Sequence, residues 1–265
     1  MATVVLTRPA GKNEALAQAL IPYGIKPLVL PALALTSTID QLPPKLTPQH
    51  FQLLIFVSAQ AVRFYLKALA NTGQTFSPHQ AIATVGAASA VPFYEAGLAT
   101  QLDLIHPPAD HPYQDSEALW ALLQPRLDHF EQVLLVRGQQ GREWLSQQLE
   151  QAQKKLTRCS IYQRSPLVWS ADSAIQLQRD LVKPQAVTFL LTSSESTQAI
   201  YDNLVRLQLD SAWKHARFVA IHPRIAEKIQ QLCGFTPEQM QEQVQLCAPS
   251  QTAMQEALLR AALPK

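Results

Sequence analysis

One stretch of the sequence decides the fold: Val187-Thr-Phe-Leu-Leu-Thr-Ser-Ser-Glu-Ser-Thr-Gln-Ala-Ile-Tyr-Asp-Asn-Leu-Val205. It begins with an aliphatic and β-branched run, which is typical of a short strand that is buried on both faces. Hydroxyl-bearing residues follow this run, and apolar side chains then recur at positions 200, 201, 204 and 205 with helical spacing. The stretch therefore predicts a strand that leads directly into an amphipathic helix.

The same order of short strand and amphipathic helix recurs along the chain. Further apolar stripes with helical spacing lie within residues 15–23, 62–69 and 145–149. Because strands that alternate with helices form parallel sheets covered on both faces, the sequence predicts an α/β fold. The other expected strands are Thr3 to Leu6, Lys26 to Leu30, Leu53 to Val57, Ile82 to Val85, Val133 to Val136, Cys159 to Tyr162, Phe218 to Ile221 and Val244 to Cys247.

The two halves of the chain share a faint internal repeat. Val5-Leu-Thr-Arg-Pro9 is similar to Leu134-Leu-Val-Arg-Gly138, and each is followed by an amphipathic helix. Four pairs of similar segments occur in the same order in both halves, at a nearly constant distance along the sequence. They predict a duplicated α/β unit, and the last helix of each copy is expected to have a Ser or Thr cap. The other pairs are Ile55 to Ala59 with Leu190 to Ser194, Ala83 to Ala87 with Val219 to Pro223, and Ser116 to Leu123 with Thr252 to Leu259.

The length and composition of the chain fit two ordinary globular domains. The chain has 265 residues, of which 47% are hydrophobic and 16% charged. Proline-containing polar segments at Ala32 to Gln49 and Arg164 to Asp172 are the candidate linkers. Since two linkers imply two crossings between domains, we expect one domain to be discontinuous.

Composition also argues against several classes of protein. A net charge of +2 without a run of Lys or Arg argues against nucleic-acid binding. The apolar run near the start is too short for a signal peptide or a membrane span, so we expect a cytoplasmic protein. Three widely spaced cysteines, Cys159, Cys233 and Cys247, indicate reduced and buried thiols instead of disulfides or structural zinc.

The candidate functional residues directly follow the expected strands, because ligands of parallel α/β sheets bind at the carboxyl ends of strands. Ser58 and Ser194 could instead be helix caps, and Arg8, Arg137 and Arg224 could pair with surface carboxylates. Tyr162 could simply pack and hydrate its hydroxyl. The segments are Thr7-Arg8, Ser58-Ala-Gln60, Gly86-Ala-Ala-Ser89, Arg137-Gly-Gln-Gln-Gly-Arg142, Tyr162-Gln-Arg164, Thr192-Ser-Ser194 and His222-Pro-Arg224.

Known sequence motifs for nucleotides, metals and serine hydrolysis are missing. Neither G-x-G-x-x-G nor G-x-x-x-x-G-K-[ST] occurs, which disfavours nucleotide binding. Neither H-E-x-x-H nor G-x-S-x-G occurs, and His106 and His111 lie in a proline-rich polar stretch that is typical of a solvated loop.

Taken together, these segments resemble the uroporphyrinogen-III synthase family, in particular its gammaproteobacterial type. The resemblance spans nearly the whole chain, and its most specific part is R-G-x-x-G-R-E with the later Y-x-R. The main carriers are Leu6-Thr-Arg-Pro9, Leu134-Leu-Val-Arg-Gly-Gln-Gln-Gly-Arg-Glu143, Tyr162-Gln-Arg164 and Leu191-Thr-Ser-Ser-Glu195.

The resemblance implies two similar flavodoxin-like α/β domains that are internally duplicated and joined by a two-stranded linker. Mapped onto this chain, residues 1–36 and 166–265 form the discontinuous domain, and residues 37–165 form the inserted domain. The family's substrate, hydroxymethylbilane, is a linear tetrapyrrole with acetate and propionate groups, held between the domains. Helix starts and hydroxyl-rich loops suit such a polycarboxylate.

The resemblance also implies the reaction of a cyclising hydro-lyase in haem biosynthesis. The bilane loses its terminal hydroxyl as water, and the ring closes through a spiro intermediate with inversion of ring D. No metal or organic cofactor takes part. Tyr162 matches the active-site tyrosine, which is expected to assist departure of the hydroxyl. The expected substrate-binding residues are Arg8, Ser58, Gly86, Ser89, Arg137, Gly138, Gly141, Thr192, Ser193, Ser194, Pro223 and Arg224.

Family-based expectations extend to partners, and two other functions stay open. We expect a monomer that meets hydroxymethylbilane synthase transiently and binds neither nucleic acid nor membranes. His222-Pro-Arg224 departs from the family, where a loop with Gly and Thr is found. One alternative is a non-catalytic two-domain receptor for a small anion, and the other is a nucleotide-dependent enzyme on a doubly wound sheet.

Overall fold

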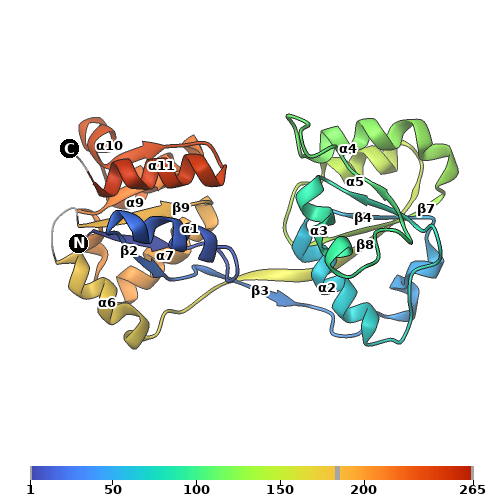
Figure 1. Ribbon diagram of the computed structural model, residues 1–265, viewed down its shortest axis with the longest axis horizontal. Coiled ribbons are helices and arrows are strands. Elements are labelled where there is room, and N and C mark those ends of the chain that lie inside the picture. Colours follow the sequence, from blue (N-terminus) through green and yellow to red (C-terminus); the bar gives the residue numbers. More distant parts are fainter. Residues whose placement is uncertain (1, 183–185, 264–265) are drawn as a thin grey trace. The chain divides into compact units, whose positions relative to one another are not determined.

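The chain forms two units in the computed structural model, which describes residues 2–182 and 186–263 (Figure 1). Unit 1 comprises Met1–Ala34 and Ser165–Lys265, and unit 2 comprises Leu35–Arg164. The predicted domain limits lie within two residues of these bounds. That each unit folds as a separate domain stays a prediction.

Unit 1 contains a parallel sheet in the order β11-β10-β9-β1-β2. If its five strands are numbered 1 to 5 in chain order, the sheet read from β2 has the order 2-1-3-4-5. This is the strand order of flavodoxin-like sheets, as predicted. Its strands are β1 (Thr3–Leu6), β2 (Lys26–Val29), β9 (Val187–Leu191), β10 (Arg217–Ala220) and β11 (Val244–Leu246).

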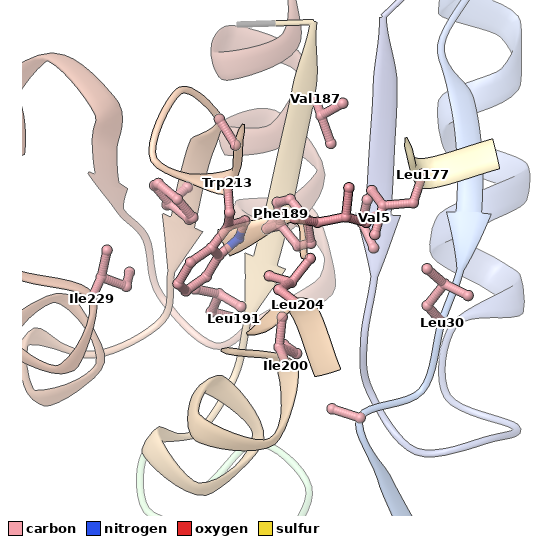
Figure 2. Close-up of a cluster of buried hydrophobic side chains, with 14 of the residues drawn as sticks. Val5, Leu30, Leu177, Val187, Phe189, Leu191, Ile200, Leu204, Trp213 and Ile229 are labelled. Atoms are coloured by element: carbon pink, nitrogen blue, oxygen red, sulfur yellow. The ribbon is translucent and has the colours of Figure 1, made fainter. Parts of the chain in front are cut away.

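Helices cover both faces of this sheet because apolar side chains of the central strands point to both faces. Phe189 and Phe218 pack on the α6, α7 and α9 side, whereas Leu190 and Val219 pack on the α1 and α11 side. Figure 2 shows Trp213 beside Phe189 in the first of these layers. The helices are α1 (Glu14–Leu20), α6 (Ala171–Leu181), α7 (Ser194–Arg206), α8 (Asp210–Trp213), α9 (Pro223–Cys233), α10 (Pro237–Gln243), α11 (Gln251–Ala262) and the 3-10 turn η1 (Ile21–Tyr23).

Unit 2 is built around a sheet in the order β3-β8-β7-β4-β5-β6. The internal sequence repeat matches β1 with β7 and β4 with β9. Each of these four strands lies between two other strands of its own sheet. The duplication itself stays a prediction. The strands are β3 (Leu33–Ser37), β4 (Leu53–Phe56), β5 (Ala81–Thr84), β6 (Asp103–Ile105), β7 (Gln132–Gly138) and β8 (Lys155–Pro166).

Alternate residues of the unit 2 strands again point to opposite faces. Leu54 and Phe56 pack with α2 and α3, while Leu53 and Ile55 pack with α4 and α5. The helices are α2 (Ala59–Ala70), α3 (Ala87–Glu95), α4 (Ser116–Leu123) and α5 (Trp144–Gln151), with 3-10 turns η2 (Pro44–Leu46), η3 (Pro48–His50) and η4 (Gln124–His129).

The strand prediction was incomplete in unit 2. Strand β3 lies inside the segment predicted as a linker, and its neighbour in the sheet is β8. Thr38 N donates to Ile161 O at 3.0 Å and Leu167 N to Ala32 O at 2.9 Å, so the two segments run antiparallel. Strand β6 was also missed, because three residues are too few for a period-two pattern.

Several helix caps lie one or two residues before their predicted positions. Asp115 caps α4 by accepting a hydrogen bond from Ala118 N, and Ser250 caps α11 by accepting from Ala253 N. The predicted Ser or Thr cap is therefore wrong for α4, which Asp115 caps, and confirmed for α11, although the cap there is Ser250 and not Thr252. An N-cap residue precedes the first residue of its helix. Asp115 and Ser250 hold this position, and each already accepts a hydrogen bond from an amide of the first turn.

The described cysteines are free thiols, as the sequence predicted. Cys159 and Cys233 are buried, and burial raises the pKa of each thiol to about 12. Cys247 is only partly buried. Within the part of the chain that the structure describes, no helix combines the length and apolar character needed to cross a membrane.

The packing of Trp213 gives a test of the unit 1 core. Its fully buried ring meets Phe218 edge-on at 5.1 Å and Phe189 at 6.0 Å. We expect Trp213→Ala to lower the free energy of unfolding by about 3–5 kcal/mol in urea titrations followed by circular dichroism. Trp213→Phe should cost only about 1–2 kcal/mol, since Trp213 Nε1 has no hydrogen-bond partner among the described residues. Equal losses would show that ring packing is not the cause.

Candidate functional site

Each unit has a pocket at the carboxyl ends of its strands, where parallel α/β sheets bind ligands. The tyrosine pocket of unit 2 has a volume of about 290 Å³, and Ser58, Arg137, Gly141 and Tyr162 contribute to its lining. The serine pocket of unit 1 has a volume of about 400 Å³ and is lined by Thr192, Ser193, Ser194, Ile221, His222, Arg224, Ile225 and Pro249. Predicted site residues thus line both pockets.

A change of register between β7 and β8 places Tyr162 in its pocket. Arg137 is paired with Ser160, but the next residue, Gly138, is paired with Tyr162, so Ile161 is skipped. Such a bulge turns a side chain toward the other face of the strand. Ile161 and Tyr162 are therefore both buried in the layer beneath α2. Tyr162 was predicted to end its strand, which was wrong, because β8 continues to Pro166.

Three groups surround the Tyr162 side chain, which is only 4% exposed. Its ring stacks on Phe64 with centroids 5.7 Å apart and planes inclined by 28°. A methyl group added to Gly138 would lie 2.8 Å from Tyr162 Cζ, so the ring uses the space that glycine leaves. The Tyr162 hydroxyl lies 3.3 Å from Ser58 Oγ. A buried phenol beside a hydroxyl, in the wall of a pocket, is suited to donate a proton.

Arg137 is committed to contacts within its own loop. Its side chain is 6% exposed, Nη1 donates to Glu143 Oε1 at 2.5 Å, and Nε donates to Gly138 O at 3.2 Å. A Cβ at Gly141 would lie 3.2 Å from Arg137 Nη2. The guanidinium therefore shapes the segment after β7, and the glycines allow it to lie close to the backbone.

Gly86 and Ser89 lie at the start of α3, where another side chain already occupies the helix end. Gln114 Oε1 accepts a hydrogen bond from Ala87 N at 2.9 Å, and a Cβ at Gly86 would lie 2.6 Å from this oxygen. Gln114 Nε2 donates in turn to Pro108 O at 2.6 Å. Neither Gly86 nor Ser89 lines the tyrosine pocket. Gln114 was missed by the sequence analysis because it lies far along the chain in a loop.

In the serine pocket, two helices of unit 1 begin side by side. Ser193 caps α7 by accepting from Ser196 N at 3.0 Å, so the cap is Ser193 and not Ser194 as the sequence suggested. Ser194 is the first residue of the helix, and its Oγ donates to Arg224 O at 3.5 Å. Helix starts carry partial positive charge and unpaired amides, which favour anions.

The second helix, α9, begins with Pro223 after the cap residue His222. Nδ1 of His222 accepts from Arg224 N at 3.2 Å, which places the proton of the neutral imidazole on Nε2. Arg224 is exposed at the mouth of the same pocket. His222 was named among the strand ends but not among the expected binding residues, although a polar residue before Pro is a recognisable cap signal.

Arg8 follows β1, the neighbour of β9 in the same sheet. Its Nε is buried and reaches no acceptor among the described residues. Desolvation lowers the pKa of Arg8, and the charge of Glu14 opposes this change. Asn13 holds the loop in place, since its Nδ2 donates to Arg8 O at 2.7 Å. Arg8 lies outside the lining of both pockets.

A comparison with protein families gives a match over most of the chain. The family model described as "Uroporphyrinogen-III synthase HemD" matches residues 14–246. This range includes every expected site residue except Arg8.

Solved structures of the same kind share the fold. The chain is similar to uroporphyrinogen-III synthetase from Helicobacter pylori, with 16% identity and a TM-score of 0.60, over 98% of this chain and 99% of that chain. It is also similar to a mutant uroporphyrinogen III synthase from Thermus thermophilus, with 16% identity and a TM-score of 0.55, over 100% of both chains. At such low identity the likeness concerns the fold.

The contact between Gly138 and Tyr162 can be tested by adding one methyl group. Gly138→Ala should lower the free energy of unfolding by about 1–3 kcal/mol, because the new Cβ would overlap the tyrosine ring. When Tyr162 is first replaced by Ala, the same substitution should cost much less. Urea unfolding of the four proteins measures this coupling. An equal cost in both backgrounds would contradict the contact.

Proposed function

Since the chain belongs to the uroporphyrinogen-III synthase family, we propose that it uses these two pockets to cyclise hydroxymethylbilane to uroporphyrinogen III. Members of the family are cyclising lyases of haem biosynthesis. The proposal concerns how the residues of this chain carry out that reaction. The observation that carries it is the buried Tyr162 hydroxyl, 3.3 Å from Ser58 Oγ in the wall of a pocket.

Tyr162 is the catalytic acid in this proposal. The hydroxyl of the bilane is a poor leaving group unless a proton accompanies it, and a positioned phenol can supply one. The adjacent pyrrole pushes the hydroxyl out and becomes an azafulvene. The substituted carbon of ring D then attacks, and a spiro intermediate rearranges to the type III ring. Burial of Tyr162 keeps competing water away from its proton.

The serine pocket binds substrate carboxylates in this proposal. Acetate and propionate groups are anions, and the starts of α7 and α9 present amides together with Thr192, Ser193, Ser194 and Arg224. Pro223 sets the first turn of α9 and needs no hydrogen bond there. The unpaired Nε of Arg8 supports a further carboxylate contact at the neighbouring strand end.

Of the remaining predicted residues, Arg137, Gly138 and Gly141 shape the tyrosine pocket in this proposal, whereas Gly86 and Ser89 lie outside its lining. Arg137 and Gly141 support the loop after β7, and Gly138 gives the Tyr162 ring its space. Gly86 and Ser89 can meet a carboxylate only if Gln114 moves from the start of α3. Since the bilane also closes spontaneously to the type I isomer, holding one conformer matters more than acid strength.

We further propose a cytoplasmic monomer that receives its substrate through transient contact with hydroxymethylbilane synthase. The support is chemical, because a bilane that closes spontaneously is best passed on after a short transit.

The described residues contain no cluster of three or more His, Cys, Asp or Glu arranged to hold a metal ion.

Isomer analysis tests the activity itself. The purified chain is coupled to a bilane-producing enzyme, and the products are oxidised and separated by chromatography. We expect predominantly type III uroporphyrin. Type I alone, from folded protein, would contradict the proposed function and favour a receptor for a polycarboxylate.

Removal of the Tyr162 hydroxyl tests the catalytic acid. Tyr162→Phe should lower kcat on the order of 10²-fold, because the leaving hydroxyl loses its proton donor. The type I fraction should rise as spontaneous closure competes. The control is Tyr94→Phe, which removes a hydroxyl from an exposed ring and should leave both quantities unchanged. Unchanged kcat in Tyr162→Phe would contradict the assignment.

Removal of the Arg224 charge tests the carboxylate site. Arg224→Ala should raise KM about tenfold and change kcat little, since a hydrogen bond to a charged group is lost in ground state and transition state alike. Arg63→Ala, which removes an exposed partner of Glu95, is the control. A lower kcat at constant KM would argue against a simple binding role.

A further inference from the structure

Ser58 occupies a branch point between a helix start and the tyrosine. Its Oγ accepts a hydrogen bond from Ala61 N at 3.1 Å, which caps α2. The same oxygen lies 3.3 Å from Tyr162 Oη. A hydroxyl has one proton and two lone pairs, so the cap leaves Ser58 with its proton and one lone pair. The direction of its bond with Tyr162 is therefore open.

Unit 1 provides an internal comparison for this serine. Ser193 has the same cap position before α7 and nearly the same backbone angles, −159° and 154° against −166° and 157° for Ser58. However, the proton of Ser193 is used locally, because its Oγ donates to Ser196 Oγ at 3.0 Å. Position 61 is an alanine and offers no such acceptor. Among the described residues, the only side-chain acceptor within hydrogen-bond distance for the proton of Ser58 is Tyr162 Oη.

A bound hydroxyl group would select one of the two directions. If Tyr162 donates to Ser58, the serine proton stays unpaired and the tyrosine cannot donate to a ligand. If Ser58 donates to Tyr162, every proton is used in an ordered chain from Ala61 N through Ser58 and Tyr162 to the ligand. Hydrogen bonds in such a chain strengthen one another. Binding of a hydroxyl-bearing substrate therefore favours the second arrangement.

We infer that Ser58 is a positioning residue for catalysis, which donates its proton to Tyr162 Oη and so directs the phenolic proton into the pocket. This inference rests on the proposed function and revises the expectation that Ser58 binds a substrate carboxylate. The phenolic proton passes to the leaving hydroxyl, the C–O bond breaks with both electrons going to oxygen, and water departs. The pyrrole nitrogen supplies the electron pair that forms the azafulvene.

Ser58 acts most strongly as the proton leaves. The phenolate that forms on Tyr162 accepts the serine hydrogen bond as a charged group, and such a bond is stronger than the neutral one before transfer. The rearranged pyrrole later loses a proton, which returns to the phenolate and restores the enzyme. The serine hydroxyl therefore contributes mainly in the transition state and should affect kcat, with little effect on KM.

Three substitutions of Ser58 separate capping from proton donation. Ser58→Gly removes the hydroxyl but leaves a tolerated helix start, Ser58→Asp keeps the cap and has no proton to give, and Ser58→Thr keeps both. We expect kcat to fall about 10-fold to 100-fold in the Gly and Asp variants, at similar KM, and to be retained in the Thr variant. Thr236→Gly, which removes the cap of α10 outside both pockets, controls for helix capping.

Combination with Tyr162→Phe decides whether Ser58 acts through the tyrosine. Ser58→Gly should cause no further loss of kcat in that background, since the acceptor oxygen is gone. An undiminished loss there, or wild-type kcat in both Ser58→Gly and Ser58→Asp, would overturn the inference. Chromatography of the isomers distinguishes the two failures, because wild-type protein that yields only type I uroporphyrin contradicts the proposed function itself.

Discussion

Burial of the parallel strands on both faces is the constraint on which the structure depends. The side chains of Leu190, Val219, Leu54 and Leu134 are each 0% exposed, so the middle of either sheet has no room for a solvated polar group. Next to the central strands β4 and β9, polar side chains that reach solvent, such as Ser58 and Thr192, lie where the strands end and helices begin. Both pockets lie there, and the packing that stabilises each unit also decides where its chemistry can occur.

The tyrosine pocket adds a local exception to this regular arrangement. A bulge opposite Gly138 turns Tyr162 toward the same layer as Ile161, and a glycine provides the space for its ring. The bulge interrupts the regular pairing of β7 with β8 at one position. In return, the Tyr162 ring stacks on Phe64. Ser58 then serves two purposes, because the helix cap and the neighbour of the tyrosine hydroxyl are the same oxygen.

Much of this could be predicted from the sequence because the signals are local. Continuous apolar runs such as Val187–Leu191 identify buried strands, and strand ends identify residues such as Ser58 and Ser193. The register shift at Gly138 could not be predicted, since it depends on how β7 meets β8 and not on either segment alone. Gln114 was missed for a similar reason, because the chain brings it to α3 from another loop.

The discontinuity of unit 1 has a consequence for synthesis of the chain. Strand β1 ends at Leu6, but its neighbour β9 begins only at Val187. At about 5–20 residues per second, the ribosome needs roughly 10–40 s to make the intervening segment. Throughout that interval β1 can pair with β2 but lacks its other neighbour, while all of unit 2 is completed. The sheet of unit 1 can therefore be completed only after the ribosome has made all of unit 2.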